Sequence, residues 1–235
     1  MDAPSIPLPP DELMIAVSGH ANHESFQKSR ISGPKQMLKD LIASGIDPEK
    51  IRDVLDFGCG CGRFLAGWVM LEKPFRLHGC DYNPLLIQWC RDNLPTVSMQ
   101  TNLLGKPVPY DANAFDFIYL LSVFTHLTLH EQKNLIAEFH RLLRPKGHVY
   151  ITFHGEYYYP KMFPLVADGE ATFNRDGFLI QHGDRQGTND CWTLHKVENI
   201  VALFDKFTLI KHFRSIDRGP THVAAHQDTL IFQKR

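Results

Sequence analysis

Residues 54–63, VLDFGCGCGR, constrain the fold of this 235-residue chain more than any other segment. An apolar run ends in the acid Asp56 and continues into three glycines, at positions 58, 60 and 62, before a helical stretch begins. Glycines at such a place let the backbone turn sharply and approach a ligand without a Cβ in the way. The segment therefore predicts a strand, a ligand-binding loop and a helix in immediate succession.

Strand and helix patterns alternate on both sides of this segment, as in a parallel sheet whose strands are joined by right-handed crossovers. Residues 1–12 are expected to form an extended tail. Helices are expected at 33–45, with Pro34 in the first turn, at 61–72, at 84–94, from the capping box at Thr128 to Leu143, and at 193–204. Strands are expected at 51–57, 75–81, 96–100, 115–123, 148–154, 207–216 and 222–234.

Two turn signals refine this pattern. Asp176-Gly177 predicts a β-hairpin turn. A tight turn at 217–220, Asp-Arg-Gly-Pro, is too short for a crossover, so the last two strands are expected to be antiparallel neighbours.

Charge and cysteine content exclude several classes. Lys plus Arg number 25 and Asp plus Glu 26, so the basic excess typical of a nucleic-acid-binding protein is missing. No run approaches the ~18 apolar residues that span a bilayer, and the first twenty residues lack a secretory signal. The five cysteines are odd in number and lack Cys-x-x-Cys spacing, which argues against disulfides and a metal site. A cytoplasmic protein is expected.

The D-x-G-x-G-x-G pattern that starts at Asp56 resembles motif I of the class I S-adenosylmethionine-dependent methyltransferases, in particular compact bacterial members with the sequence LDFGCGCGR. An acid about twenty residues later, Asp81, and the segments FDFIYLLSVFTHL and LLRPKGHVYITF agree with the family in order and spacing. The resemblance covers about residues 33–154. It implies an α/β, Rossmann-like doubly wound sheet of seven strands in the order 3-2-1-4-5-7-6, with the last strand antiparallel.

The same resemblance implies S-adenosyl-L-methionine as the cofactor and assigns residues to it. Asp81 lies where the family's ribose-binding acid lies, and Tyr82 beside it can stack on adenine. Arg63 is either a surface cation or a partner for the cofactor carboxylate, and Cys59 is a small spacer in the loop. The full expected set is Asp56, Gly58, Cys59, Gly60, Gly62, Arg63, Asp81, Tyr82, Asn102 and Leu103 at the adenine edge, and Ser122 and Val123 near the methionine part.

The methyl acceptor is expected to be a small molecule or a glycan. Residues 121–124, LSVF, replace the Asn/Asp-Pro-Pro-Tyr box of enzymes that methylate exocyclic amines of bases, and the Pro-Cys pair of cytosine-C5 enzymes is missing. These absences favour O-methylation of a hydroxyl, while carboxylates and nitrogens remain open. Removal of a hydroxyl proton needs a base, and His126 and His154 follow the fourth and fifth strands, whose ends face the ligand crevice. Alternatives are His182, His222, Asp184 and Asp190.

The resemblance divides the chain into a tail and cover segment at 1–32 and a methyltransferase domain at 33–235. Residues 155–193 break the strand–helix alternation and mix aromatic with polar side chains, so they are expected to form a cap over the acceptor site.

Two other functions remain open. A cofactor-binding module of the same fold without turnover would carry the same cofactor residues. A nicotinamide oxidoreductase is disfavoured, because the third glycine of G-x-G-x-x-G would fall at Arg63. The sequence does not indicate an oligomeric state.

Overall fold

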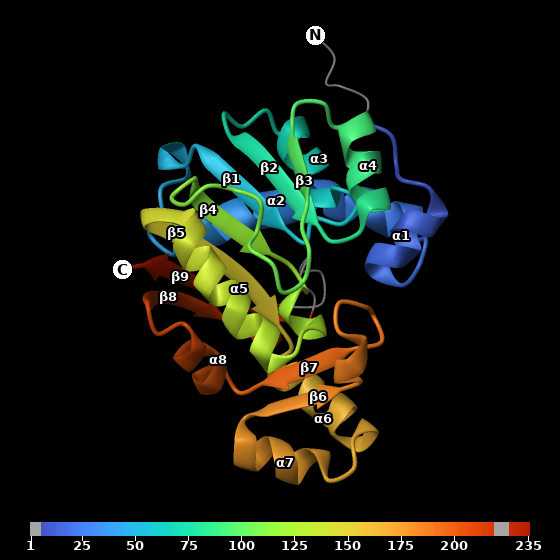
Figure 1. Cartoon of the computed structure of the whole chain (residues 1–235), viewed down its shortest axis with the longest axis vertical. Coiled ribbons are helices and arrows are strands. Elements are labelled where there is room, and N and C mark those ends of the chain that lie inside the picture. The colour runs from blue at the N-terminus through green and yellow to red at the C-terminus, as the bar shows by residue number, and fades with distance from the viewer. Residues whose placement is uncertain (1–5, 219–225) are drawn as a thin grey trace.

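The computed structural model describes residues 6–218 and 226–235. Seven of its strands form one sheet in the order β3-β2-β1-β4-β5-β9-β8 (Figure 1). All neighbouring strands are parallel except β9, which runs antiparallel to both β5 and β8. The predicted order and antiparallel last strand are confirmed. The strands are β1 (Asp53–Phe57), β2 (Arg76–Asp81), β3 (Ser98–Thr101), β4 (Phe115–Leu120), β5 (Leu143–Phe153), β8 (Phe207–Phe213) and β9 (Asp228–Lys234).

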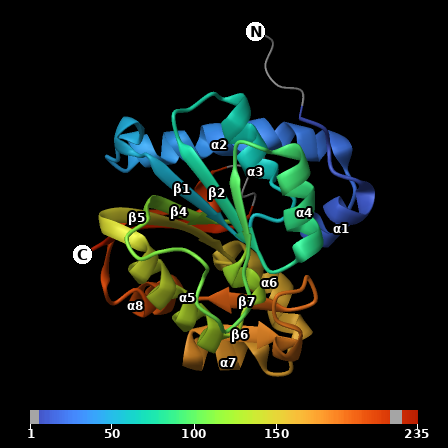
Figure 2. The ribbon, with the colours of Figure 1, turned by 45° about the horizontal axis from the view of Figure 1, so that its top comes forward.

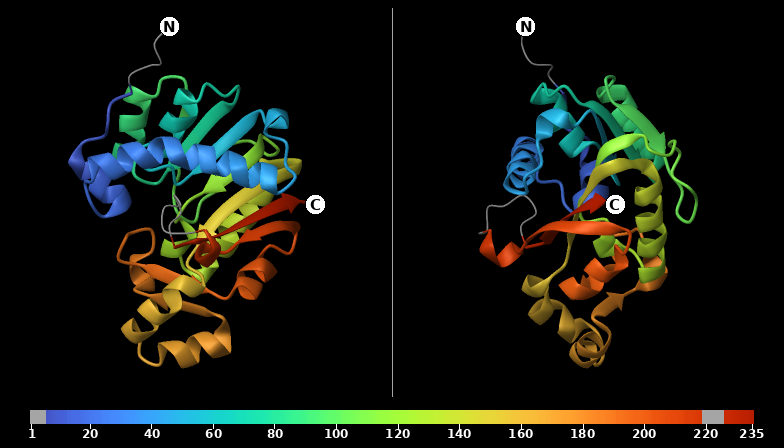
Figure 3. Two further views of the ribbon diagram at one scale, coloured as in Figure 1. Left: turned by 180° about the vertical axis from the view of Figure 1, so that it is seen from behind. Right: turned by 90° about the vertical axis from the view of Figure 1, so that its left-hand side faces the viewer.

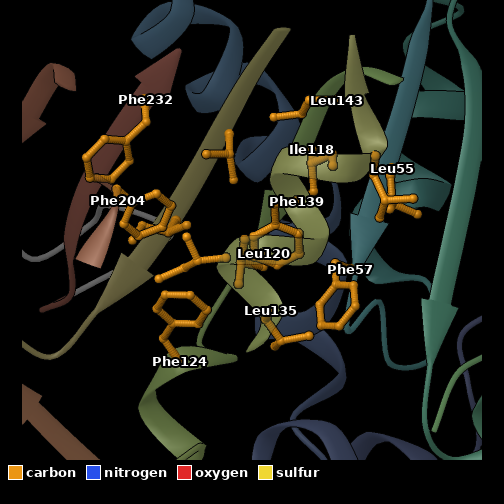
Figure 4. Packing of buried hydrophobic residues seen from close by; sticks show 14 of the residues in the cluster. Leu55, Phe57, Ile118, Leu120, Phe124, Leu135, Phe139, Leu143, Phe204 and Phe232 are labelled. Carbon is orange, nitrogen blue, oxygen red and sulfur yellow. The ribbon is translucent and has the colours of Figure 1, made fainter. Parts of the chain in front are cut away.

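Helices cover both faces of this sheet, as its nearly continuous apolar strands require. One face packs against α2 (His23–Ala43), α3 (Arg63–Met70) and α4 (Pro84–Asn93), and α2 crosses that face in the rear view (Figure 3, left). The other face packs against α5 (Leu129–Leu142) and α8 (Val197–Leu203). Figure 4 shows this second core, in which the rings of Phe204 and Phe232 stack at a centroid distance of 4.0 Å.

The carboxyl ends of the five parallel strands β1 to β5 lie along one edge of the sheet. In this arrangement a ligand crevice forms at the edge between β1 and β4, where the strand order reverses. The edge therefore gathers the residues that follow β1, β2, β3 and β4 in one place, although they are far apart in the sequence.

Residues 155–195, hereafter called the cap after the predicted role of residues 155–193, have their own small sheet and apolar cluster and project below the main sheet in Figure 1. The cap contains α6 (Tyr159–Met162), α7 (Gly169–Asp176), β6 (Phe178–Gln181) and β7 (Trp192–His195). The hairpin turn predicted at Asp176-Gly177 is wrong. Gly177 instead ends α7 in the left-handed conformation and donates its N–H to the Phe173 carbonyl, an arrangement that Asp-Gly also favours.

The N-terminal prediction is also partly wrong. Residues 6–10 are not helical, as expected for a tail, but the helix α1 (Asp11–Ser18) begins at the last two residues of the predicted tail. This helix packs beside α4 through the apolar cluster around Met14 (Figure 2). The next helix starts ten residues before the predicted position 33, because Asn22 caps it with a side chain that accepts from Ser25 N–H. Pro34 therefore lies inside α2 rather than in its first turn, and the boundary expected between residues 32 and 33 falls within a helix.

The C-terminal segments are shorter than predicted. Residues 193–195, which were expected to begin the helix, belong to strand β7 and pair with β6. The helix α8 begins at Val197. Strands β8 and β9 are the expected antiparallel neighbours, but residues 214–227 connect them, so the connection is longer than a tight turn. Gly219 and Pro220 of that expected turn, and His222, lie outside the described residues. No helix in the described part of the chain is long and apolar enough to cross a membrane.

Candidate active site

One pocket opens at the carboxyl edge of the sheet, with about 900 Å3 of empty space that includes its mouth. Eight residues of the expected site line this pocket: Gly58, Gly60, Asp81, Tyr82, Asn102, Ser122, Val123 and His126. The fold thus brings together segments that follow four different strands.

The glycine loop after β1 forms one wall of the pocket. Gly58 and Gly60 both have positive φ angles, of 70° and 56°, which glycine adopts most easily. A Cβ on Gly58 would lie 2.5 Å from Val123 Cγ2, and one on Gly60 would lie 2.7 Å from Val17 Cγ2. The loop therefore packs closely against its neighbours and presents bare backbone to the pocket.

Asp81 closes the end of β2 and is tied to this loop. Its carboxylate accepts hydrogen bonds from Gly60 N–H and from Asn83 N–H, each at 2.9 Å. Burial raises its pKa, and the backbone donors oppose that shift. A carboxylate has about four acceptor positions, so two remain for hydroxyl groups of a ligand.

Tyr82 and Asn102 flank Asp81 in the pocket. The Tyr82 ring is 44% exposed, and its hydroxyl donates to the Gly187 carbonyl at 2.9 Å. Asn102 is buried, and its Oδ1 has no hydrogen-bond partner among the described residues. Leu103 is 63% exposed and does not line the pocket. The next residue, Leu104, lines it instead.

Four further residues of the expected set, in or next to the glycine loop, do not line the pocket: Asp56, Cys59, Gly62 and Arg63. Asp56 accepts a hydrogen bond from the Tyr119 hydroxyl at 2.8 Å, and burial raises its pKa to about 7. The Arg63 guanidinium lies 5.5 Å from the ring centroids of both Phe26 and Phe64. Asp56 and Arg63 thus contact side chains outside the pocket lining.

Ser122 follows β4 in a left-handed conformation, with a φ of 60°, that side chains adopt rarely. Three hydrogen bonds hold it there. Its N–H donates to Thr152 Oγ1 at 2.8 Å, its hydroxyl donates to Gln227 Oε1 at 3.1 Å, and its carbonyl accepts from the Thr125 hydroxyl. Strained backbone of this kind gathers at ligand sites, where the surrounding structure enforces it.

Of the two histidines expected as bases, only His126 lines the pocket. Its Nδ1 lies 2.6 Å from the Cys191 carbonyl oxygen. Because a carbonyl only accepts, Nδ1 carries the proton, and the neutral ring keeps its lone pair on Nε2. Burial lowers the pKa of His126, so the neutral form dominates near pH 7.

His154 is buried behind the pocket. Its Nδ1 lies 3.0 Å from the Thr193 carbonyl, Gln227 Nε2 lies 3.5 Å from its Nε2, and its ring lies 4.1 Å from that of Tyr158. Burial lowers its pKa to about 4. The alternatives His182, Asp184 and Asp190 lie in the cap outside the lining, and Asp190 pairs with Arg185 at 3.2 Å.

The sequence predicted covering segments at 1–32 and 155–193 but did not indicate which of their residues reach the pocket. Ala16 and Val17 reach it from α1, and Gly187 and Asn189 reach it from the loop before β7. Asn189 Nδ2 donates to the Ala16 carbonyl at 3.4 Å, which joins the two covers. Apolar residues on a short N-terminal helix and a glycine in a loop are common in proteins, so no local pattern marks them.

Comparison with known proteins agrees with this geometry. Residues 55–151 match the model of the family described as "Methyltransferase domain". The match supports the assignment of residues 55–151 to a class I S-adenosylmethionine-dependent methyltransferase domain. It is 29% identical over 123 residues to a probable methyltransferase, PMT5, of Arabidopsis thaliana, a match that covers 50% of this chain and 20% of that protein. The chain thus spans a minor part of the length of that relative.

Two solved structures share the fold. The amino pentose methyltransferase CalS10 of Micromonospora echinaspora, solved with S-adenosylmethionine, has a TM-score of 0.61 at 16% identity, over 91% of this chain and 94% of that one. The 1,6-didemethyltoxoflavin-N1-methyltransferase of Burkholderia thailandensis has a TM-score of 0.60 at 15% identity, over 97% and 92%.

The pocket fits S-adenosylmethionine, the cofactor of this methyltransferase class. The unpartnered Asn102 Oδ1 suits an amino group, and the Asp81 carboxylate suits a pair of hydroxyls. No cluster of metal-ligating side chains occurs in residues 6–218 and 226–235.

Proposed function

We propose that this methyltransferase transfers a methyl group from S-adenosylmethionine to a hydroxyl of a small molecule or glycan, with His126 as general base. The observation that carries the proposal is the hydrogen bond from His126 Nδ1 to the Cys191 carbonyl in the same pocket as Asp81. This bond leaves Nε2 as the proton acceptor of a neutral, buried imidazole.

Each part of the pocket has a role in this proposal. Asp81 binds the ribose hydroxyls, the ring of Tyr82 stacks on the adenine, and Asn102 accepts from its amino group, while the backbone at Gly58 and Gly60 borders the methionine part. When bound, the cofactor supplies an electrophilic methyl group on a positively charged sulfur. His126 removes the proton of the acceptor hydroxyl and releases it to solvent.

The acceptor class rests on two supporting arguments. The two structural neighbours described above act on small molecules by name, an amino pentose and 1,6-didemethyltoxoflavin. Helix α1 and the loop before β7 also cover the pocket, which leaves no broad open face for a large polymer. We further propose that residues 1–32 act as a cover and that residues 155–193 form the specificity cap.

A direct test measures S-adenosylhomocysteine release against a panel of sugars, glycans, phenols and other hydroxylated metabolites. With the accepted compound, His126→Gln should lower the turnover by roughly 10²–10⁴-fold, while affinity for S-adenosylhomocysteine stays within about threefold. His130→Gln, on the exposed part of α5, is the matched control and should change neither quantity.

The pH dependence of turnover checks the same assignment. The base must be neutral, so kcat/KM should rise with pH through the lowered pKa of His126, below the ordinary value of about 6.5. A protein that binds S-adenosylmethionine but releases no S-adenosylhomocysteine with any acceptor would be the binding module without turnover. An unchanged turnover in His126→Gln would show that His126 is not the general base.

A further inference from the structure

The loop at residues 186–191, hereafter the strap, crosses the mouth of the pocket and contacts both of its halves. It starts after a short helical turn at Gly183–Arg185 and ends at Cys191, whose side chain is fully buried. Hydrogen bonds from its side chains and backbone connect it to Tyr82, His126 and Thr128. Together they connect the cofactor half of the pocket with the base.

On the cofactor half, the Tyr82 hydroxyl donates to the Gly187 carbonyl at 2.9 Å. Gly187 has a φ of 84°, and a Cβ there would lie 3.5 Å from Leu104 Cδ1 and 4.0 Å from the Tyr82 ring. The strap backbone therefore lies directly against two residues that line the pocket. A group that stacks on the Tyr82 ring restrains its hydroxyl, and through it the strap.

On the base half, the strap holds His126 from two directions. Gly187 N–H donates to the His126 carbonyl at 2.8 Å, and the Cys191 carbonyl accepts from His126 Nδ1 at 2.6 Å. Gln186 adds a third anchor, because its Oε1 accepts from the Thr128 hydroxyl at 2.9 Å and from Thr128 N–H at 3.3 Å. Main chain and ring of His126 are thus both fixed by one loop.

We infer that Gln186 and Tyr82 are positioning residues that act through this strap to keep His126 in its Nδ1–H form, with Nε2 free to accept a proton. The inference deepens the proposed function, since it assigns the position of the base on which that function rests. It also links the two halves of the pocket, because a cofactor bound against Tyr82 steadies the loop that orients His126. Neither residue needs to contact the acceptor.

The test reads the tautomer of His126 and requires no turnover. Protein labelled with 15N in its histidines is studied by NMR at a pH where His126 is neutral, with and without S-adenosylhomocysteine, and His126→Gln identifies the signals. The wild type should show the Nδ1–H form, enriched further by the ligand. Gln186→Met should shift the tautomer ratio by about fivefold toward Nε2–H, which corresponds to ~1 kcal/mol.

Three further variants separate positioning from a general structural effect. Gln186→Glu keeps an acceptor oxygen for Thr128 and should restore the wild-type ratio. Tyr82→Phe keeps the ring but loses the hydroxyl, and in it the ligand should no longer enrich the Nδ1–H form. Tyr110→Phe loses a matched hydroxyl that donates to the Gly79 carbonyl at 3.0 Å outside the pocket, and it should behave as the wild type.

The outcomes distinguish this inference from the proposed function. A wild-type tautomer ratio in both Gln186→Met and Tyr82→Phe would overturn the role of the strap, even if His126→Gln abolishes turnover. A tautomer shift in both variants supports the strap, even if no hydroxyl acceptor is found. Tyr82→Phe removes only the hydroxyl of a partly exposed residue, so this variant is expected to fold. It therefore tests the strap even if Gln186→Met does not fold.

Discussion

The cofactor half and the acceptor half of this pocket are assembled in different ways. Asp81 accepts its hydrogen bonds from Gly60, which is 21 positions away in the sequence, and from Asn83, which is 2 positions away. Around His126 the separations are larger. His126 and its partner Cys191 are 65 positions apart, and Thr128 and Gln186 are 58 positions apart. The first half is built by neighbouring strand ends, whereas the second depends on a separate cap that folds back.

This difference has a functional consequence. The cofactor half rests on the rigid sheet, and its shape is set by the glycine loop and by β2. The acceptor half changes whenever the cap changes, because strap and cap strand supply the carbonyls that hold His126 and His154. A family with one cofactor and many acceptors can vary the second half while it retains the first.

Replacement of residues 155–193 by a short flexible linker should therefore separate the two halves most completely. We expect acceptor turnover to be lost, because His126 and His154 both lose the carbonyls that hold their Nδ1 atoms. Cofactor affinity should stay within about threefold, ~0.65 kcal/mol, in calorimetry with S-adenosylhomocysteine. Surviving turnover, or loss of both activities in a protein that remains folded, would contradict this division.

The opposite change, Asp81→Ala, should break the cofactor half. Each charge-assisted hydrogen bond to a ribose hydroxyl contributes roughly 1.5–3 kcal/mol at most, so one lost bond weakens cofactor binding by about 10–150-fold. The glycine loop also loses the acceptor of Gly60 N–H. Calorimetry measures the affinity, and Asp92→Ala on the exposed side of α4 is the control. An unchanged affinity would remove Asp81 from the cofactor site.

The same contrast explains how far the sequence could predict the site. Asp81, Tyr82 and Asn102 lie at or just after the ends of predicted strands, and the resemblance in order and spacing to the methyltransferase family was enough to assign them to the cofactor. Gly187 and Cys191 act through backbone carbonyls, which every residue has. No side-chain pattern can therefore reveal them before the cap is folded.

Errors in the predicted fold have similar physical causes. Asp176-Gly177 suits both a hairpin turn and a helix end, and only the packing of α7 in the cap decides between them. Residues 193–195 have helical spacing with 197–204, but pairing with β6 takes them into a strand. The parallel strands of the main sheet all lie where their runs predicted them, although β5 begins at Leu143, five residues before the predicted start at 148.

A third prediction concerns the buried His154 and the stability of the protein at low pH. Burial lowers the pKa of His154 to about 4 in the folded protein, whereas an unfolded chain has a value of about 6.5. The unfolded state thus binds more protons between these values, and the free energy of unfolding falls as the pH decreases from about 6.5 toward 4. From pH 6.5 to pH 5 this one group contributes a loss of roughly 2 kcal/mol.

His154→Gln should reduce this acid-induced loss, because the glutamine amide does not titrate. Urea unfolding at several pH values measures the effect, and His20→Gln, at an exposed histidine, is the control. An unchanged pH slope in His154→Gln would show that His154 is not the buried neutral histidine that destabilises the protein in acid.

The smallest expected effect concerns Asn102, the residue of the cofactor half with an unmet hydrogen bond. Its Oδ1 is buried without a partner among the described residues, and such an atom costs stability until a ligand donor reaches it. Its backbone N–H donates to the Asp81 carbonyl at 3.1 Å and does not depend on the side chain. Asn102→Ala should therefore weaken cofactor binding by about fivefold, ~1 kcal/mol, without lowering the free energy of unfolding of the free protein. Gln100→Ala, on the exposed side of β3, is the matched control for both measurements. If Asn102→Ala destabilised the free protein and left the affinity unchanged, the side chain would be part of the scaffold, and the adenine edge would have to be recognised by other residues of the pocket.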